Sequence, residues 1–123
     1  MSRIFLLEDH TWFRQALANF LEREPDLEVI AQAESLSEAR AEASQKAPEI
    51  DLALIDLLVA DGIGTDVIRD LREVVPDVPV LVLTVAQGPD LYNWVRAMGA
   101  DEMISKDASV EEIITAIRLL LRR

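Results

Sequence analysis

The sequence predicts an α/β fold, with a doubly wound parallel sheet and helices on both faces. Three short apolar runs without polar alternation have the length and composition of buried central strands, and they span residues 4–7, 52–55 and 80–83. Segments with helical spacing of apolar residues follow the strands, so that strand and helix alternate along the chain. The chain has 123 residues and no cysteine, which predicts one domain without disulfides or cysteine-bound zinc.

The first strand, residues 4–7, leads into a predicted helix over residues 12–23. Thr11 is expected to cap this helix, because a threonine hydroxyl can accept a hydrogen bond from an N–H group of the first turn. Five apolar residues share one face of the helix: Phe13, Ala16, Leu17, Phe20 and Leu21. His10 has no partner at metal-ligand spacing and is interpreted as a loop residue.

The second strand, residues 27–33, mixes polar with apolar side chains, which suits the edge of a sheet. The next helix is expected to begin with a capping box, in which Ser35 and Glu38 satisfy each other's backbone N–H groups. After the third strand, a helix is predicted over residues 65–75, ending before Pro76.

The last third of the chain repeats the alternation. A helix over residues 91–98 is closed by Gly99, and residues 102–105 form a second polar-rich edge strand. The final helix begins with a second capping box, Ser109 and Glu112. Its predicted buried face consists of Val110, Ile113, Ile114, Ile117 and Leu121.

The predicted edge strands are second and fifth in chain order, and crossover connections are right-handed. This arrangement predicts a flavodoxin-like (βα)5 sheet with strand order 2-1-3-4-5. In such sheets ligands bind beyond the carboxyl ends of the strands, where the strand order reverses between strands one and three. Asp61 and Gly62 are interpreted as turn residues.

The formal net charge of −11 predicts a surface that repels nucleic acid and acidic lipids. Direct nucleic acid binding and membrane association are therefore not expected. The apolar stretch near the N-terminus is too short for a signal peptide, and no apolar stretch is long enough to cross a bilayer. We expect a cytoplasmic protein.

Polar side chains stand at the predicted strand ends: Glu8 and Asp9 after strand one, Asp56 after strand three, Thr84 after strand four and Lys106 after strand five. Carboxylates within about 4 to 6 Å of one another repel by a few kcal/mol per pair at an effective dielectric near 20. Mg²⁺ prefers oxygen ligands and accepts one or two carboxylates together with phosphate oxygens. The pattern therefore predicts a Mg²⁺ site, with Lys106 as a second positive charge.

The segments FLLEDH, LALIDLLVADGIG, VLVLT and GADEMISKDAS resemble the receiver domain of two-component response regulators, and most of all the LuxR/NarL-type subfamily. The resemblance covers essentially the whole chain and implies one receiver domain over residues 1–123, with no effector domain in this chain. It implies a signalling switch, not a conventional enzyme. A sensor histidine kinase would donate the phosphoryl group. Phosphorylation would alter a protein-binding surface, and this surface would form a homodimer. The altered surface would control an output, which in this subfamily is transcription through an effector domain.

Carried over by position, the resemblance makes Asp56 the phosphoacceptor. Asp9, Asp56 and the backbone carbonyl of Leu58 would ligate Mg²⁺, and Glu8 would help to hold the ion. Leu58 is apolar, and we hypothesise that it screens the phosphoryl group from attacking water, so that phosphate is lost slowly.

Thr84 and Lys106 would each contact a phosphoryl oxygen. Four residues depart from the family pattern: besides the apolar Leu58, Ala60 replaces the usual proline, Val85 stands where a small residue is typical, and Met103 replaces the usual aromatic residue. The bulk of Val85 is expected to impede entry of the phosphoryl group. Met103 is expected to weaken the usual coupling between Thr84 and the output surface, because in the family that coupling involves rotation of the aromatic residue. The alternative function is a receiver-like interaction module that does not depend on phosphorylation.

Two other classes fit the sequence poorly. A phosphatase of the haloacid dehalogenase kind needs a second acid two residues after its nucleophile, and Leu58 occupies that position. A flavin site needs a phosphate loop rich in Ser, Thr and Gly after strand one, where the sequence reads EDHTW.

Overall fold

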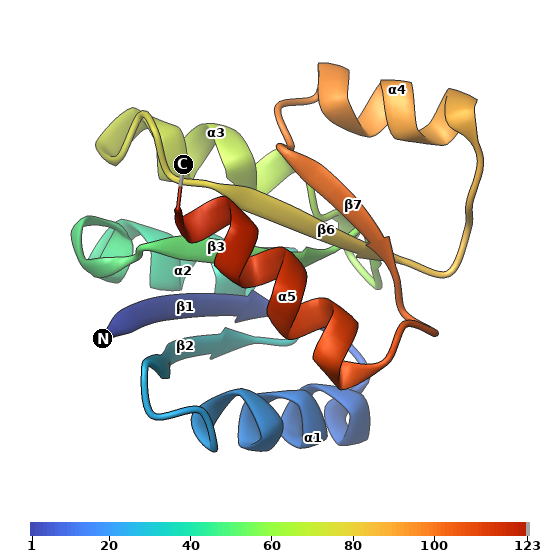
Figure 1. Ribbon diagram of the computed structural model, residues 1–123. Coiled ribbons are helices and arrows are strands. Elements are labelled where there is room, and N and C mark those ends of the chain that lie inside the picture. The colour runs from blue at the N-terminus through green and yellow to red at the C-terminus, as the bar shows by residue number, and fades with distance from the viewer. Residues whose placement is uncertain (123) are drawn as a thin grey trace.

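The computed structural model describes residues 1–122, which form a five-stranded parallel sheet covered by helices on both faces (Figure 1). The sheet order is β2-β1-β3-β6-β7, and every neighbouring pair is parallel. Counted as sheet strands only, this is the predicted order 2-1-3-4-5, and the flavodoxin-like fold is confirmed. The strands are β1 (Ser2–Leu7), β2 (Leu27–Ala33), β3 (Leu52–Asp56), β6 (Val80–Thr84) and β7 (Glu102–Ser105).

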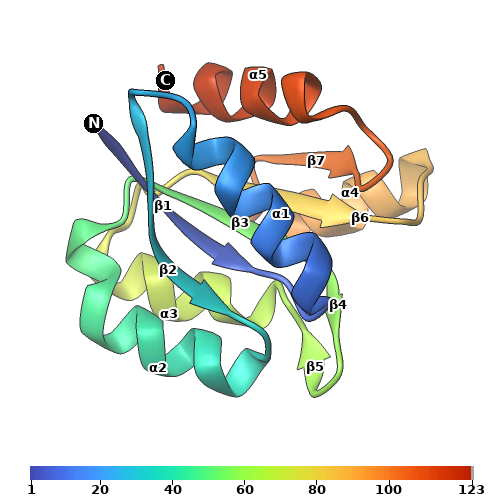
Figure 2. The same ribbon diagram turned by 90° about the horizontal axis from the view of Figure 1, so that it is seen from below.

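Two helices pack on one face of the sheet and three on the other (Figures 1 and 2). The first group is α1 (Thr11–Glu22) and α5 (Val110–Leu121). The second group is α2 (Leu36–Lys46), α3 (Asp66–Val74) and α4 (Pro89–Ala97), with a short 3-10 turn, η1 (Ala47–Glu49), after α2. No helix within residues 1–122 is long and apolar enough to cross a membrane.

The continuous apolar runs arise because successive side chains of a strand point to opposite faces, and both faces are covered. In β1, Ile4 and Leu6 pack against α1 and α5, whereas Phe5 and Leu7 pack against the helices of the opposite face. All four side chains are fully buried. The two apolar layers hold the carboxyl ends of the central strands in fixed positions.

The start of α1 differs from the prediction. Nδ1 of His10 accepts a hydrogen bond from the N–H of Phe13 at 3.2 Å, so His10 caps the helix and Thr11 is its first residue. The prediction of Thr11 as the cap was wrong, as was that of His10 as a plain loop residue. The buried face is also rotated, because Ala18 is buried whereas Phe20 is 41% exposed.

The two predicted capping boxes have different outcomes. The side chains of Ser109 and Glu112 each accept the other's backbone N–H, at 3.1 and 3.3 Å, which confirms the box at α5. At α2, Ser35 accepts the N–H of Glu38 at 3.1 Å, but the Glu38 carboxylate accepts the N–H of Glu34 at 3.4 Å. The reciprocal bond predicted at α2 is therefore wrong, and the acid binds one residue earlier.

A small antiparallel hairpin that the sequence did not predict follows the third strand. Its two strands are β4 (Leu58–Val59) and β5 (Gly62–Ile63). The carboxylate of Asp61, at its turn, accepts the backbone N–H groups of Leu36 and Ser37 at 2.7 and 3.1 Å. Asp61 is therefore more than a turn residue, because it also caps the first turn of α2.

Candidate functional site

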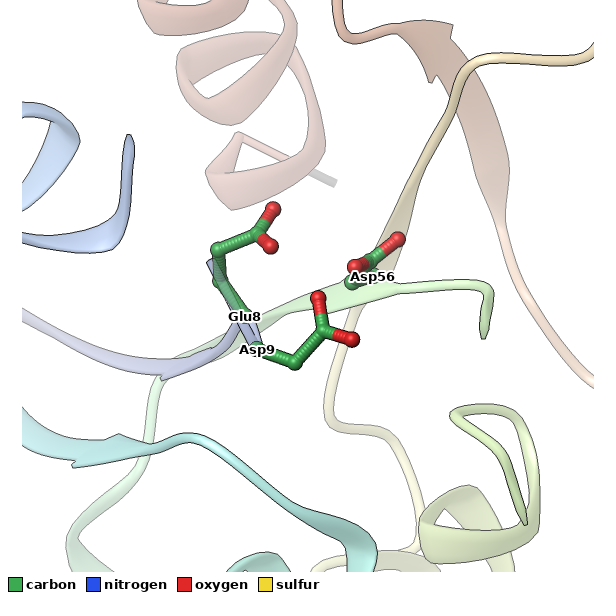
Figure 3. Close-up of side chains that lie close together, drawn as sticks. All are labelled: Glu8, Asp9 and Asp56. Atoms are coloured by element: carbon green, nitrogen blue, oxygen red, sulfur yellow. The ribbon is translucent and has the colours of Figure 1, made fainter. Parts of the chain in front are cut away.

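The central strands deliver three carboxylates to one point at the edge of the sheet. Glu8 and Asp9 directly follow β1, and Asp56 is the last residue of the neighbouring strand β3. One carboxylate oxygen from each of the three residues lies within 4.8 Å of the others (Figure 3). The parallel register of β1 and β3 thus brings together acids that are far apart in the sequence.

Lys106 reaches this acidic cluster from the loop after β7. Its Nζ lies 2.6 Å from Oε1 of Glu8 and 3.2 Å from Oδ2 of Asp56. The backbone N–H of Lys106 donates to the carbonyl of Thr84 at 3.0 Å, which fixes the loop to the end of β6. The ammonium group also lies 5.2 Å from the centre of the Phe13 ring, within the range of a cation–π contact. A single cation is thereby shared by two acids and an aromatic face.

Burial leaves the cluster with more negative charge than Lys106 can balance. Glu8 is fully buried and Asp56 is only 4% exposed. Burial, followed by the negative charge of Glu8, raises the pKa of Asp56 from 3.8 to about 7, although Lys106 pulls it down. Burial alone would lower the pKa of Lys106, but the two carboxylates outweigh it and raise that pKa. An additional cation beside Asp56 would relieve this imbalance.

The donor set fits a hard divalent cation. All side-chain donors in the cluster are carboxylate oxygens, the ligand type that Mg²⁺ and Ca²⁺ prefer. Asp9 is accessible to solvent, so an ion held there can keep water ligands, as Mg²⁺ usually does. The three acids can therefore hold a metal ion.

Two contacts that the sequence did not predict hold the end of β1. The N–H of His10 donates to Oε2 of Glu8 at 2.9 Å, and the Arg14 guanidinium donates to the carbonyl of Glu8, also at 2.9 Å. Arg14 also lies 3.7 Å from a carboxylate oxygen of Glu34. The sequence around His10 gave no signal for the contacts of His10 and Arg14 with Glu8, because both contacts depend on how α1 packs against the end of β1.

Thr84 ends β6 next to the acidic cluster. It is buried, and its hydroxyl oxygen accepts the N–H of Ala86 at 3.1 Å. No acceptor within residues 1–122 takes the hydroxyl hydrogen in a hydrogen bond. That hydrogen is available to donate toward an anionic group at the strand ends.

None of the four residues that depart from the expected pattern belongs to the acidic cluster. Val85 is 74% exposed, so its side chain is not packed into the acidic cluster, and Ala60 is exposed in the hairpin. Leu58 is 63% exposed on β4, two residues after Asp56. Met103 is partly buried and packs on the core beneath α2, α3 and α4. None of these side chains removes a charged group from the cluster.

The family model of the response regulator receiver domain matches residues 4–118. The chain belongs to this family. Receiver domains act in two-component signalling with histidine kinases and are not conventional enzymes. The geometry described above is the acidic pocket of this receiver domain.

Relatives place this receiver domain with the LuxR/NarL-type regulators. It is 31% identical over 118 residues to the DNA-binding transcriptional activator DevR/DosR of Mycobacterium tuberculosis, a match over 96% of this chain and 54% of the relative. The chain spans about half the length of the curated relatives it matches. Transcriptional activation is the activity that the name of DevR/DosR states for that relative.

Two solved structures show the same fold. A LuxR-family response regulator from Aurantimonas sp. SI85-9A1 is 25% identical, with a TM-score of 0.89 over 99% of this chain and 86% of that one. A response regulator from Burkholderia pseudomallei, solved with a phosphorylated aspartic acid, calcium ion and citrate, is 27% identical. Its TM-score is 0.82, over 99% of this chain and 69% of that one.

Proposed function

We propose that this receiver domain is a signalling switch in which Asp56 accepts a phosphoryl group from a sensor histidine kinase. The observation that carries the proposal is the place of Asp56, at a strand end beside two other acids and 3.2 Å from Nζ of Lys106. A buried carboxylate in this position is a nucleophile with positive charge beside it. The phosphorylated aspartic acid of the Burkholderia relative supports the same chemistry here.

The metal would be Mg²⁺. Asp9, Asp56 and the backbone carbonyl of Leu58 would hold the ion, with Glu8 supporting it from the buried side. The all-oxygen cluster and the raised pKa of Asp56, caused first by burial, support this assignment. When bound, Mg²⁺ neutralises negative charge on the phosphoryl oxygens.

In the transfer, a carboxylate oxygen of Asp56 forms a bond to phosphorus while the bond from phosphorus to the histidine nitrogen of the kinase breaks. The electron pair of that bond remains on the imidazole, and the product is an aspartyl phosphate. Lys106 stabilises the charge on the phosphoryl oxygens from a fixed position, because Glu8 holds its ammonium group at 2.6 Å. The fixed ammonium also favours the ionised, nucleophilic form of Asp56.

The switch would operate through Thr84. Its hydroxyl group would donate to the phosphoryl oxygen and change its contact with the N–H of Ala86, which lies in the loop before α4. Val95 is the one fully buried residue of α4, so few contacts oppose a change in the position of this helix. Moving the equilibrium from 1:99 to 99:1 requires about 5.5 kcal/mol of preference. A dianion held by Lys106, Thr84 and a metal ion is a reasonable source of that preference.

The output would be an altered protein-binding surface, including a homodimer formed on phosphorylation. In DevR/DosR the output is transcriptional, as its name states. Here it would act through an effector domain outside residues 1–123. The receiver would then control when that effector is active.

Calorimetric titration with beryllofluoride, a phosphoryl mimic, in the presence of Mg²⁺ tests the proposal. The wild-type chain should bind the mimic, and Asp56→Asn should abolish binding because the mimic needs the carboxylate oxygen. Asp77→Asn, which removes the same charge from an exposed turn, is the matched control and should bind normally. If the wild-type chain does not bind, the proposal fails and the phosphorylation-independent interaction module is favoured.

A further inference from the structure

The hairpin after Asp56 is attached to the first turn of α2. Oδ1 of Asp61 accepts the N–H of Leu36 at 2.7 Å, and Oδ2 accepts the N–H of Ser37 at 3.1 Å. These N–H groups have no partner inside their own helix, and a negative charge there is favoured by the helix dipole. The two bonds lower the pKa of Asp61 below its usual value of 3.8, which shows that they favour the ionised carboxylate.

The hairpin backbone also lies directly against α2. A Cβ atom at Gly62 would lie 2.9 Å from Cδ2 of Leu36, closer than packed atoms approach. Leu36 is buried, so its side chain has little room to give way. The turn of the hairpin is therefore fixed to α2 both by hydrogen bonds and by shape.

The other end of the hairpin closes on the backbone of the phosphoacceptor strand. The N–H of Gly64 donates to the carbonyl of Leu57 at 2.7 Å, and Leu58 pairs with Ile63 across the hairpin. A Cβ atom at Gly64 would lie 1.9 Å from the carbonyl oxygen of Asp56. A continuous set of close contacts thus runs from the first turn of α2 to Asp56.

We propose that Asp61 is a positioning residue for the metal and phosphoacceptor site, acting by holding the hairpin against α2. The hairpin includes Leu58, whose carbonyl would face the metal, and Asp61 fixes the place of that carbonyl relative to Asp9 and Asp56. The inference rests on the proposed function and adds a residue that does not touch the site. The first turn of α2 would then also help to fix the position of the Leu58 carbonyl, because Asp61 is hydrogen-bonded to this turn.

Calorimetric titration with Mg²⁺ alone tests this role in the whole chain, comparing the wild type with Asp61→Ala and Ser35→Ala. Ser35 caps the same helix but accepts the N–H of Glu38, so Ser35→Ala weakens α2 without releasing the hairpin. Asp61→Ala should weaken Mg²⁺ binding about tenfold, the lower end of the range for losing a group that orients a metal ligand. Ser35→Ala should bind Mg²⁺ as the wild type does.

Asp61→Asn keeps one acceptor oxygen and should give an intermediate affinity, and it replaces Asp61→Ala if that variant does not fold. A second readout is hydrogen exchange at the Leu36 and Ser37 amides, which Mg²⁺ should slow in the wild type but not in Asp61→Ala. Equal Mg²⁺ affinity in all variants, or equal weakening by Ser35→Ala, would overturn the positioning role while leaving the proposed function intact. Absence of Mg²⁺ binding by the wild type would overturn both.

Discussion

Replacing Asp56 with asparagine should stabilise the metal-free protein at alkaline pH. Burial and then the charge of Glu8 raise the pKa of Asp56 from 3.8 to about 7 in the folded state. Each pKa unit corresponds to about 1.4 kcal/mol, so the ionised Asp56 side chain costs the fold at most about 4 kcal/mol. Asparagine has nearly the same shape and carries no charge, so Asp56→Asn avoids this cost.

The sign of the pH dependence follows from the same values. Between the unfolded pKa of 3.8 and the folded pKa of about 7, the folded chain binds more protons at Asp56 than the unfolded chain does. The contribution of Asp56 to stability therefore falls as the pH rises through this window. The advantage of Asp56→Asn should be largest near about pH 8 and should vanish near about pH 4.

Urea unfolding in the presence of a chelator measures this difference. With the usual urea dependence of about 1–3 kcal/mol per molar, the midpoint for Asp56→Asn should lie above that of the wild type near pH 8, by up to about 1–4 M. Added Mg²⁺ should stabilise the wild type and leave Asp56→Asn nearly unchanged. Asp77→Asn is again the exposed control. An Asp56→Asn variant that is no more stable than the wild type at alkaline pH would refute the electrostatic account of the pocket.

Two further predictions concern the hairpin after Asp56. Leu58→Asn should shorten the lifetime of the phosphorylated protein about tenfold, because the amide can orient an attacking water where the exposed leucine excludes it. This factor is smaller than the rate gain that a positioned general base usually gives, because an amide does not take up the proton of the water. Loss of radiolabelled phosphate measures this lifetime, and an unchanged value counts against the screening role of Leu58. Gly64→Ala should lower the free energy of unfolding by about 1–3 kcal/mol or more, because the new Cβ would lie 1.9 Å from the Asp56 carbonyl oxygen and the backbone must shift. Thermal unfolding beside the exposed control Ala60→Ser measures the loss, and an unchanged melting temperature would contradict the close approach.

Much of the fold could be predicted because local patterns and sheet topology agree. The three apolar runs can be buried on both sides only in the centre of a covered sheet, and the polar-rich runs over residues 27–33 and 102–105 belong at its edges. Once the strands are parallel, their carboxyl ends share one edge, so Glu8, Asp9 and Asp56 had to approach one another.

The details at helix starts could not be predicted in the same way, because neighbouring polar residues compete for the same N–H groups. At α1, His10 takes the capping bond and Thr11 becomes the first helical residue. At α2, the Glu38 carboxylate accepts the N–H of Glu34, and Asp61, from another part of the chain, accepts the N–H groups of Leu36 and Ser37. Spacing along the sequence does not reveal which acceptor is nearer in space.

By itself, the sequence determined the order of the strands, the edge of the sheet where the acids meet and the carboxylate oxygens that could hold a metal ion there. Only the tertiary structure decided how strongly the ionised form of Asp56 is destabilised and that Lys106 pairs with both Glu8 and Asp56. The reason is that burial and distances near 3 Å depend on packing between distant segments of the chain. The same holds for Asp61. Its contact with α2 joins residues 25 positions apart, and no periodicity along the chain encodes such a contact.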